Sequence, residues 1–146
     1  MSSHFFSNQK ASQFAELALP LPLRQTFTYH LPENIRENVK IGSRLLVPFG
    51  KRNLTGYTVE LHETLDEGLE IDAENIKDAI ELLDEEPLLT DEILRLTQWT
   101  ADYYSASWGE VLKASLPAGV NVETEQIVQI TSSGRDELFK VTTAKT

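Results

Sequence analysis

The sequence predicts an α+β fold, in which a small, mainly antiparallel β-barrel or sheet is followed by a helical subdomain. Four short segments before residue 62 alternate apolar and polar side chains and are separated by Pro, Gly and Asn, as strands joined by tight turns are. Beyond Pro87 the apolar spacing changes to three and four residues, which is typical of an amphipathic helix. With 146 residues, 40% of them hydrophobic, the chain is long enough to bury a core.

The β part is expected at residues 13–83, after a flexible leader at residues 1–12. Its first strand, residues 14–21, meets two prolines, Pro20 and Pro22. Because proline donates no ladder hydrogen bond, they restrict this strand to an edge or an end of the sheet. Further strands are expected at residues 26–31, 44–47, 54–61 and 76–83, with turns at residues 32–34 and 50–53.

The helical part is expected at residues 88–117. Thr90 is a suitable N-cap for a helix that runs to Tyr104, since its hydroxyl can accept a hydrogen bond from the first turn. A second helix is expected at residues 108–116, before Pro117. The apolar face of the first helix is predicted to consist of Ile93, Leu96, Thr100 and Tyr103.

Residues 120–146 are expected to be a linker followed by a strand at residues 126–130 and a helix that starts at residues 132–140. One strand and one helix bury little core by themselves. We therefore interpret this tail as the first part of a second domain.

The net charge of -10 conceals a division between the two halves of the chain. Residues 1–56 hold seven Lys/Arg and three acids, whereas residues 57–146 hold six Lys/Arg and twenty acids. Such asymmetry is typical either of a polyanion partner for the basic half or of a partner-facing acidic half. Two hypotheses follow: a nucleic-acid-binding module, and an acidic protein-interaction module with no nucleic-acid binding of its own.

Catalytic and metal-binding motifs are missing from the sequence. There is no cysteine, and Gly50-Lys51 is followed by Arg52 instead of completing a phosphate-binding loop. The three histidines lack the spacing of a helix-borne zinc site. We therefore expect no metal, no cofactor and no enzyme activity in this chain, and an enzyme that uses its carboxylates is a third hypothesis. The longest apolar stretch, Leu17–Leu23, is too short to span a bilayer, so we expect a cytoplasmic protein that does not bind a membrane.

Two turns combine aromatic and basic residues. Phe27, Phe49 and Tyr57 offer rings on which a base can stack, and Lys51 and Arg52 can contact phosphates. The alternative is that Phe27 and Tyr29 simply belong to the core face of one strand. The combination favours nucleic acid as the partner.

Five segments in register carry a resemblance to a known family. They are Ala18–Tyr29 (ALPLPLRQTFTY), Gly42–Arg52 (GSRLLVPFGKR), Leu82–Pro87 (LLDEEP), Trp99–Tyr104 (WTADYY) and Trp108–Pro117 (WGEVLKASLP). In this order they resemble the N-terminal part of the PriA family, the replication-restart helicases of bacteria that are also called primosomal protein N′.

The resemblance implies that residues 13–119 form a DNA-binding domain that captures the 3′ end of the nascent leading strand at a stalled fork. It places the pocket at Phe27 and Thr28, Gly50 and Lys77. Lys51 and Arg52, which the aromatic and basic pattern indicated, are expected as auxiliary phosphate contacts. Phe27 packs on the terminal base, Lys77 contacts it, and Gly50 lets the backbone approach the nucleotide. The family has an aspartate where this chain has Thr28, which predicts weaker discrimination against a 3′-phosphate.

The tail, Gln126–Arg135, resembles the start of the family's winged-helix domain. The family's helicase motifs and cysteine-rich zinc module do not occur in the 146 residues. ATP and zinc are therefore expected only in the missing helicase part, and other primosome proteins and single-strand-binding proteins are expected to bind through missing domains. The chain itself is expected to be a binding fragment of an ATP-dependent 3′-to-5′ DNA helicase.

Overall fold

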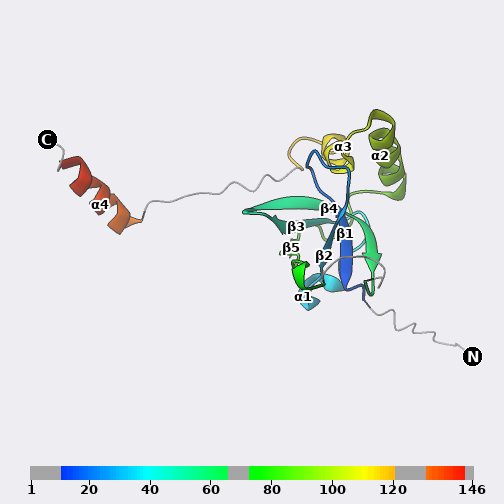
Figure 1. Cartoon of the computed structure of the whole chain (residues 1–146), viewed down its shortest axis with the longest axis horizontal. Helices are drawn as coiled ribbons and strands as arrows, with labels where there is room; N and C mark the ends of the chain where they lie inside the picture. Colours follow the sequence, from blue (N-terminus) through cyan, green and yellow to red (C-terminus); the bar gives the residue numbers. More distant parts are fainter. Residues whose placement is uncertain (1–10, 66–72, 121–130, 144–146) are drawn as a thin grey trace, which may run out of the picture.

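The computed structural model describes residues 11–65, 73–120 and 131–143. A five-stranded antiparallel sheet packs against two helices, which confirms the α+β class (Figure 1). The strands are β1 (Phe14–Ala18), β2 (Phe27–His30), β3 (Arg44–Phe49), β4 (Arg52–His62) and β5 (Glu81–Leu82). The helices are α1 (Glu33–Arg36), the 3₁₀ turn η1 (Ala73–Asn75), α2 (Asp91–Tyr104), α3 (Trp108–Ser115) and α4 (Ser132–Thr143).

The sheet has the strand order β2-β1-β4-β3-β5 and stays open. Its neighbouring strands are antiparallel, and β2 and β5 form its two edges. The barrel that the sequence left as an alternative is therefore not closed. A parallel bridge between His30 and Asp78 adds a short contact on the outer side of β2.

Strand β1 differs from its prediction in length and position. It ends at Ala18 and lies between β2 and β4, so it is not an edge strand. The prolines fall just beyond its end, where Leu21 N–H donates to the Leu19 carbonyl and Leu23 N–H donates to the Leu21 carbonyl. Proline thus terminates the strand along its own direction and leaves both flanks of β1 free to pair.

Three other predicted boundaries move. β3 extends to Phe49 and β4 begins at Arg52, so Gly50 and Lys51 alone form the hairpin turn. The turn expected at residues 32–34 is the start of α1, whose first bond runs from Ile35 N–H to the Pro32 carbonyl. The strand expected at residues 76–83 is reduced to β5 and the bridge at Asp78.

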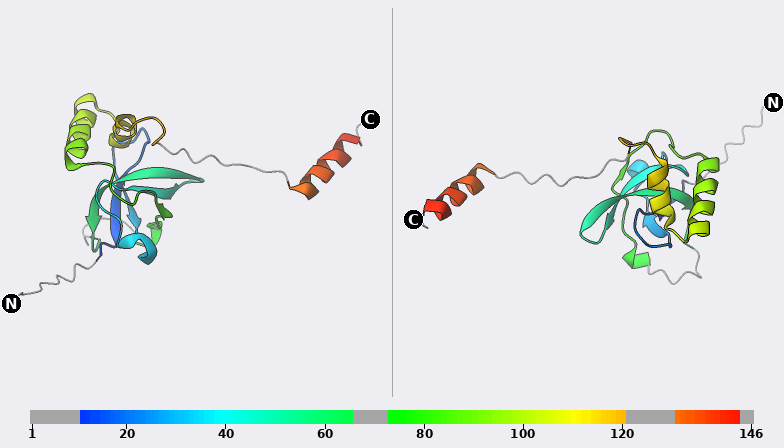
Figure 2. Two further views of the ribbon diagram at one scale, coloured as in Figure 1. Left: turned by 180° about the vertical axis from the view of Figure 1, so that it is seen from behind. Right: turned by 90° about the horizontal axis from the view of Figure 1, so that it is seen from above.

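Two buried clusters hold the domain together. One lies on the face of the sheet formed by side chains such as Leu17, Leu31 and Leu45. The other joins Ala18, Tyr57, Val59, Leu89, Leu94 and Leu112, and it seats α2 and α3 on the sheet. The two helices lie side by side (Figure 2). Gly109 lets α3 approach the segment that follows β1, because a Cβ there would lie 1.8 Å from the Leu19 carbonyl oxygen.

Helix α2 is confirmed, but its predicted apolar face is right only in part: Ile93 packs against the core, whereas Leu96 and Tyr103 are exposed. Thr90 caps it as expected, with its hydroxyl accepting a 3.4 Å hydrogen bond from Ile93 N–H. The side chains it buries are Leu94, Thr97 and Ala101. The polar Thr97 is tolerated inside because its hydroxyl donates to the helix backbone and accepts a bond from the Trp108 indole N–H. Leu96, Trp99, Tyr103 and Tyr104 point to solvent instead.

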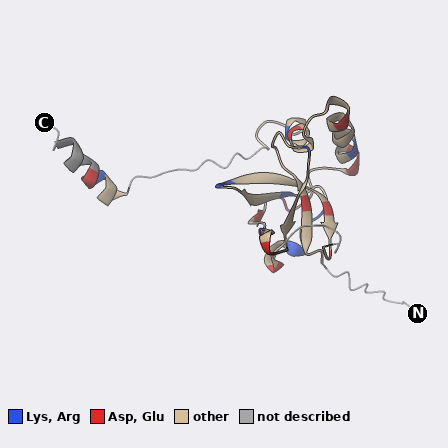
Figure 3. Cartoon of the chain, in the orientation of Figure 1, with Lys and Arg blue, Asp and Glu red and all other residues tan. Residues whose placement is uncertain are grey.

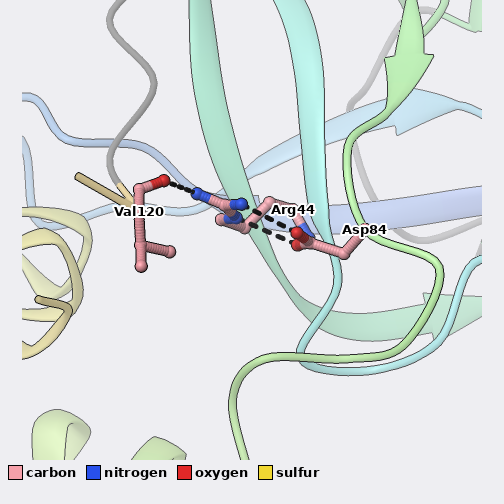
Figure 4. Close-up of polar contacts among 3 residues, drawn as sticks. All are labelled: Arg44, Asp84 and Val120. Atoms are coloured by element: carbon pink, nitrogen blue, oxygen red, sulfur yellow. Dashed lines mark hydrogen bonds and ion pairs between the residues drawn. The ribbon is translucent and has the colours of Figure 1, made fainter.

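Arg44 joins β3 to two other segments (Figure 4). It forms a buried ion pair with Asp84, which precedes α2, and a hydrogen bond with Val120, which follows α3. The Arg44 guanidinium donates to both carboxylate oxygens of Asp84, at 2.9 and 2.7 Å, and it also donates to the Val120 carbonyl. The hydrogen bond to Asp84 raises the pKa of Arg44 above its usual value. The segment around Asp84, which precedes α2, is thus fixed against β3.

The predicted helix in the tail is confirmed as α4, which Figure 1 shows apart from the sheet. The predicted strand at residues 126–130 lies outside the described residues. A single helix does not establish a winged-helix domain, so that expectation is not confirmed. The boundaries proposed for the leader and for the linker remain predictions.

Candidate nucleic-acid interface

An open cavity of about 530 Å³ lies where β2, the end of β3 and the segment after η1 meet. Ten residues from these three segments line it: Thr26, Phe27, Thr28, Tyr29, Pro48, Phe49, Gly50, Asn75, Ile76 and Lys77. The four residues that the sequence placed in the DNA pocket, Phe27, Thr28, Gly50 and Lys77, are all among them. The structure therefore brings together groups that are separated by as many as fifty residues along the chain.

Two aromatic rings meet at the wall of the cavity. The rings of Phe27 and Phe49 pack edge to face, with centroids 5.4 Å apart and planes at 83°. Each side chain is only half-buried, so part of each ring is open to a ligand. An edge-to-face pair holds the two rings at fixed orientations, which is favourable for stacking a planar base.

Tyr29 links β2 to β3 beside this pair of rings. It is 5% exposed, and its hydroxyl donates a 2.8 Å hydrogen bond to the Pro48 carbonyl. Burial raises the pKa of Tyr29, so the hydroxyl stays protonated and able to donate. Pro48 itself precedes the turn that contains Gly50.

The turn beside the cavity requires glycine for its backbone. Gly50 has φ of 60°, in the left-handed region where a Cβ is unfavourable. A Cβ built at Gly50 meets no protein atom within 4 Å. The space over this residue is therefore open, and a ligand can approach the main chain.

Lys77 is held at the outer edge of β2 by main-chain bonds. The N–H of His30 donates to the Lys77 carbonyl at 3.0 Å, and the N–H of Ala79 donates to the His30 carbonyl at 2.9 Å. A 2.8 Å hydrogen bond between the His30 ring and the Asp78 carboxylate strengthens the bridge. These bonds fix the backbone of Lys77, while its side chain stays exposed.

The remaining aromatic and basic candidates lie elsewhere. Lys51 and Arg52 are exposed at the tip of the β3–β4 hairpin, next to Gly50, but they do not line the cavity. Figure 3 shows Lys and Arg at this tip and acidic residues on α2. Tyr57 is wrong as a stacking candidate, because it is 1% exposed and belongs to the cluster beneath the helices.

Sequence reasoning missed some members of the cavity. Asn75 and Ile76 follow an acidic segment with no pattern that indicates a ligand site, and they line the cavity just before the main-chain bridge to β2 at Asp78. Two histidines also acquire carboxylate neighbours: His30 with Asp78, and His62 with Glu16 and Glu60 at 3.5 and 3.4 Å. The His30–Asp78 pair joins β2 to the segment after η1, the His62–Glu16 pair joins β4 to β1, and the His62–Glu60 pair lies within β4.

A second open cavity, of about 520 Å³, lies between the sheet and α2. Its lining includes three carboxylates, Glu16, Glu60 and Asp102, and one guanidinium, Arg24. Arg24 pairs with Asp102 at 3.5 Å, and both side chains are exposed. The balance of charge in this cavity is therefore acidic, in contrast to the first.

The chain matches the sequence profile of the PriA 3′ DNA-binding domain (3′BD) over residues 16–117. It is similar to replication restart protein PriA of Bacillus subtilis (strain 168), with 29% identity over 120 residues, 80% of this chain and 14% of that protein. PriA of Haemophilus influenzae is 30% identical over 105 residues, which cover 72% of this chain and 14% of the relative. PriA of Treponema pallidum is 28% identical over 103 residues, 70% of this chain and 16% of the relative.

These matches put residues 16–117 in the class of DNA-binding domains. The chain belongs to the family of PriA 3′ DNA-binding domains. It spans only 14% of the length of the Bacillus and Haemophilus relatives. Within the described part of the chain, no helix has the length and apolar character needed to cross a bilayer.

Proposed function

We propose that the cavity binds the 3′ end of the nascent leading strand at stalled replication forks. One observation carries the proposal: a single open cavity combines Phe27, Thr28, Gly50 and Lys77, drawn from three separate segments. An aromatic ring, a hydroxyl, an open stretch of main chain and a cation are the groups that a terminal nucleotide needs.

Each residue has a separate role in this proposal. Phe27 packs on the terminal base, a contact worth about 1–3 kcal/mol in other single-strand complexes. Lys77 contacts the same nucleotide with its ammonium group, and the space over Gly50 admits the sugar or the phosphate close to the main chain. Lys51 and Arg52 attract the neighbouring phosphates from the hairpin tip, which makes their share of the affinity dependent on salt.

Thr28 sets the tolerance for the chemistry of the end. Its hydroxyl can exchange a hydrogen bond with a free 3′-hydroxyl, but it carries no charge to repel a 3′-phosphate. We propose that this domain discriminates less between the two ends than a domain with aspartate at the same position.

The domain acts within a larger replication-restart protein in this proposal. The PriA relatives are much longer than this chain. We propose that the parts of such a protein outside this chain supply the ATP-dependent 3′-to-5′ helicase, the zinc module and the surfaces for other primosome and single-strand-binding proteins. The 3′-end domain then contributes recognition without catalysis, in the cytoplasm where bacterial chromosomes replicate.

The test is fluorescence anisotropy with two labelled forks at low salt. In one fork the leading strand ends in a free 3′-hydroxyl, and in the other the same position lies inside continuous duplex. We expect the wild-type chain to prefer the free end, and Phe27→Ala and Lys77→Ala to remove that preference. Lys40→Ala is the matched control, because Lys40 is an exposed lysine that pairs with Glu86 outside the cavity.

Phe27 packs partly against the core, so its variant can lose stability as well as affinity. Lys77→Ala avoids this difficulty, since the Lys77 side chain is exposed. Equal affinity of the wild type for both forks contradicts the proposal. So does an effect of Lys77→Ala no larger than that of Lys40→Ala, and the acidic interaction module then becomes the leading hypothesis.

A further inference from the structure

The outer face of α2 exposes large apolar side chains that the fold does not use. Leu96, Trp99, Tyr103 and Tyr104 are 63%, 60%, 68% and 71% exposed. The rings of Trp99 and Tyr103 stack with centroids 5.3 Å apart, and Tyr103 and Tyr104 meet edge to face at 4.9 Å. We call these four residues the α2 face. Single exposed apolar residues are ordinary, but a contiguous aromatic patch on a helix indicates a contact surface.

The α2 face is separate from the contacts that hold α2 in place. The helix is anchored through Leu94, Thr97 and Ala101 on its other side. The second tryptophan behaves differently: Trp108 is half-buried and its indole N–H donates to Thr97 at 3.1 Å. Trp99 is more than half exposed, so truncating it removes little core packing.

Acidic side chains border the α2 face. Glu92 lies four residues before Leu96 and therefore on the same side of the helix. Asp102 directly precedes Tyr103 in the sequence. The second cavity adjoins this helix through Gln98, Ala101 and Asp102, and it adds the carboxylates of Glu16 and Glu60. Arg24 pairs with Asp102 and Arg95 lies near Glu92, so two guanidinium groups offset part of the charge of these four carboxylates and the balance stays acidic.

This charge decides between three possible occupants. Single-stranded DNA could stack on the rings, but its phosphates are repelled by the carboxylates. A second copy of the chain would bring the same acids against one another. A protein segment with lysine or arginine beside apolar side chains satisfies both the rings and the carboxylates.

We propose that the α2 face and the acid-lined cavity beside it dock a basic, apolar segment of a partner protein. The rings of Trp99 and Tyr103 bury the apolar side chains of that segment, as aromatic residues do at the centre of many interfaces. The carboxylates of Glu92, Asp102 and the cavity receive its cations. The α2 face shares no residue with the 3′-end cavity, and the acid-lined cavity shares Thr26 with it, so the peptide and the DNA end meet at most at that residue.

The experiment uses two fluorescein-labelled helical peptides with the same leucine pattern, one with lysine and one with glutamate at the remaining positions. We expect the leucine–lysine peptide to bind the whole chain saturably and to change the emission of Trp99. The variant Trp99→Ala/Tyr103→Ala should weaken this binding at least tenfold. Ile41→Ala is the matched control, because Ile41 is an exposed apolar residue away from α2.

A charge test complements the truncation. Glu92→Lys/Asp102→Lys should weaken the leucine–lysine peptide and strengthen the leucine–glutamate peptide. Phe27→Ala, by contrast, should leave peptide binding unchanged, and Trp99→Ala/Tyr103→Ala should leave the preference for free 3′ ends unchanged. The proposal therefore stands or fails independently of the 3′-end assignment.

Several results overturn the proposal. These are no saturable binding of the leucine–lysine peptide, equal binding of the two peptides, or equal binding by the truncated variant. Binding of single-stranded DNA that depends on Trp99 and Tyr103 assigns the face to nucleic acid instead. A concentration-dependent dimer that the same double variant abolishes assigns it to a second copy.

Discussion

The Tyr29 hydroxyl and the Pro48 carbonyl are joined by a 2.8 Å hydrogen bond that links the two walls of the 3′-end cavity. Tyr29 comes from β2, next to Phe27 and Thr28, and Pro48 comes from β3, next to Phe49 and Gly50. The bond therefore fixes the distance between the stacking wall and the open turn. In the proposed binding mode it gives Tyr29 a positioning role, since Tyr29 orients the cavity wall and is itself buried.

Tyr29→Phe removes this hydroxyl and keeps the ring. A neutral hydrogen bond contributes about 0.5–1.5 kcal/mol, so the affinity for a free 3′ end should fall roughly two- to tenfold. Anisotropy with the free-end fork measures the change, and Tyr104→Phe, which alters an exposed tyrosine outside the cavity, is the control. Unchanged end affinity would show that the wall geometry does not depend on this bond.

Gly50→Ala should affect DNA binding more than stability. The φ of 60° costs a residue with a Cβ about 1–2 kcal/mol, but no protein atom lies in the way of the new methyl group. Gly119→Ala is the matched variant, because Gly119 also has positive φ and no atom within 4 Å of a Cβ. Urea titrations should give comparable losses for the two variants, whereas only Gly50→Ala should weaken end binding. Equal DNA affinities would mean that the nucleotide does not approach the turn.

Thr28→Asp should restore discrimination against a 3′-phosphate. The new carboxylate repels a phosphate dianion and can still accept a hydrogen bond from a free hydroxyl. The ratio of dissociation constants for 3′-phosphate and 3′-hydroxyl ends is the quantity to measure, in the wild type and the variant. An identical ratio in both proteins refutes the role given to Thr28.

Asp84→Ala should destabilise the domain strongly. It leaves the buried Arg44 guanidinium without its carboxylate, and breaking a buried pair in this way costs about 3–5 kcal/mol. Glu86→Ala breaks the exposed pair with Lys40 and should change the free energy of unfolding by less than about 1 kcal/mol. Chemical denaturation of both variants measures the difference. Similar small losses would indicate that water replaces Asp84 at the guanidinium.

Stability should also decline in strong alkali. Burial raises the pKa of Tyr29 and of Tyr57 above the usual tyrosine value of 10.0. Above that value the unfolded chain releases protons that the folded chain retains, so the free energy of unfolding decreases as the pH rises. Thermal melts of the wild type and of Tyr29→Phe/Tyr57→Phe between pH 8 and 11 test this prediction. If the melting temperature of the double variant declines as steeply as that of the wild type, the prediction is wrong.

The sequence predicted the elements better than the faces they bury. Thr90 and the apolar spacing were sufficient for α2, because capping and periodicity are local. The buried side of that helix depends on the Trp108–Thr97 contact, which joins two helices and leaves no local signal. The spacing of Leu96 and Tyr103 is equally helical, yet it faces solvent.

The 3′-end cavity shows the same limit. Phe27, Thr28 and Gly50 were placed by their turns and by resemblance, and Lys77 by resemblance alone. What the sequence could not supply is the parallel bridge between His30 and Asp78, which brings Lys77 to the edge of β2 across 48 residues. Pairing at such a separation depends on the whole sheet and not on the residues near Lys77.

Arg44 has one further effect, on the geometry of attachment. Its guanidinium holds the Val120 carbonyl, so the polypeptide leaves the domain from a point that is rigidly related to β3 and to the 3′-end cavity. A module attached beyond Val120 is therefore joined to the domain at a point that is fixed relative to the cavity, and its local concentration at a bound DNA end depends on the length and stiffness of what joins them.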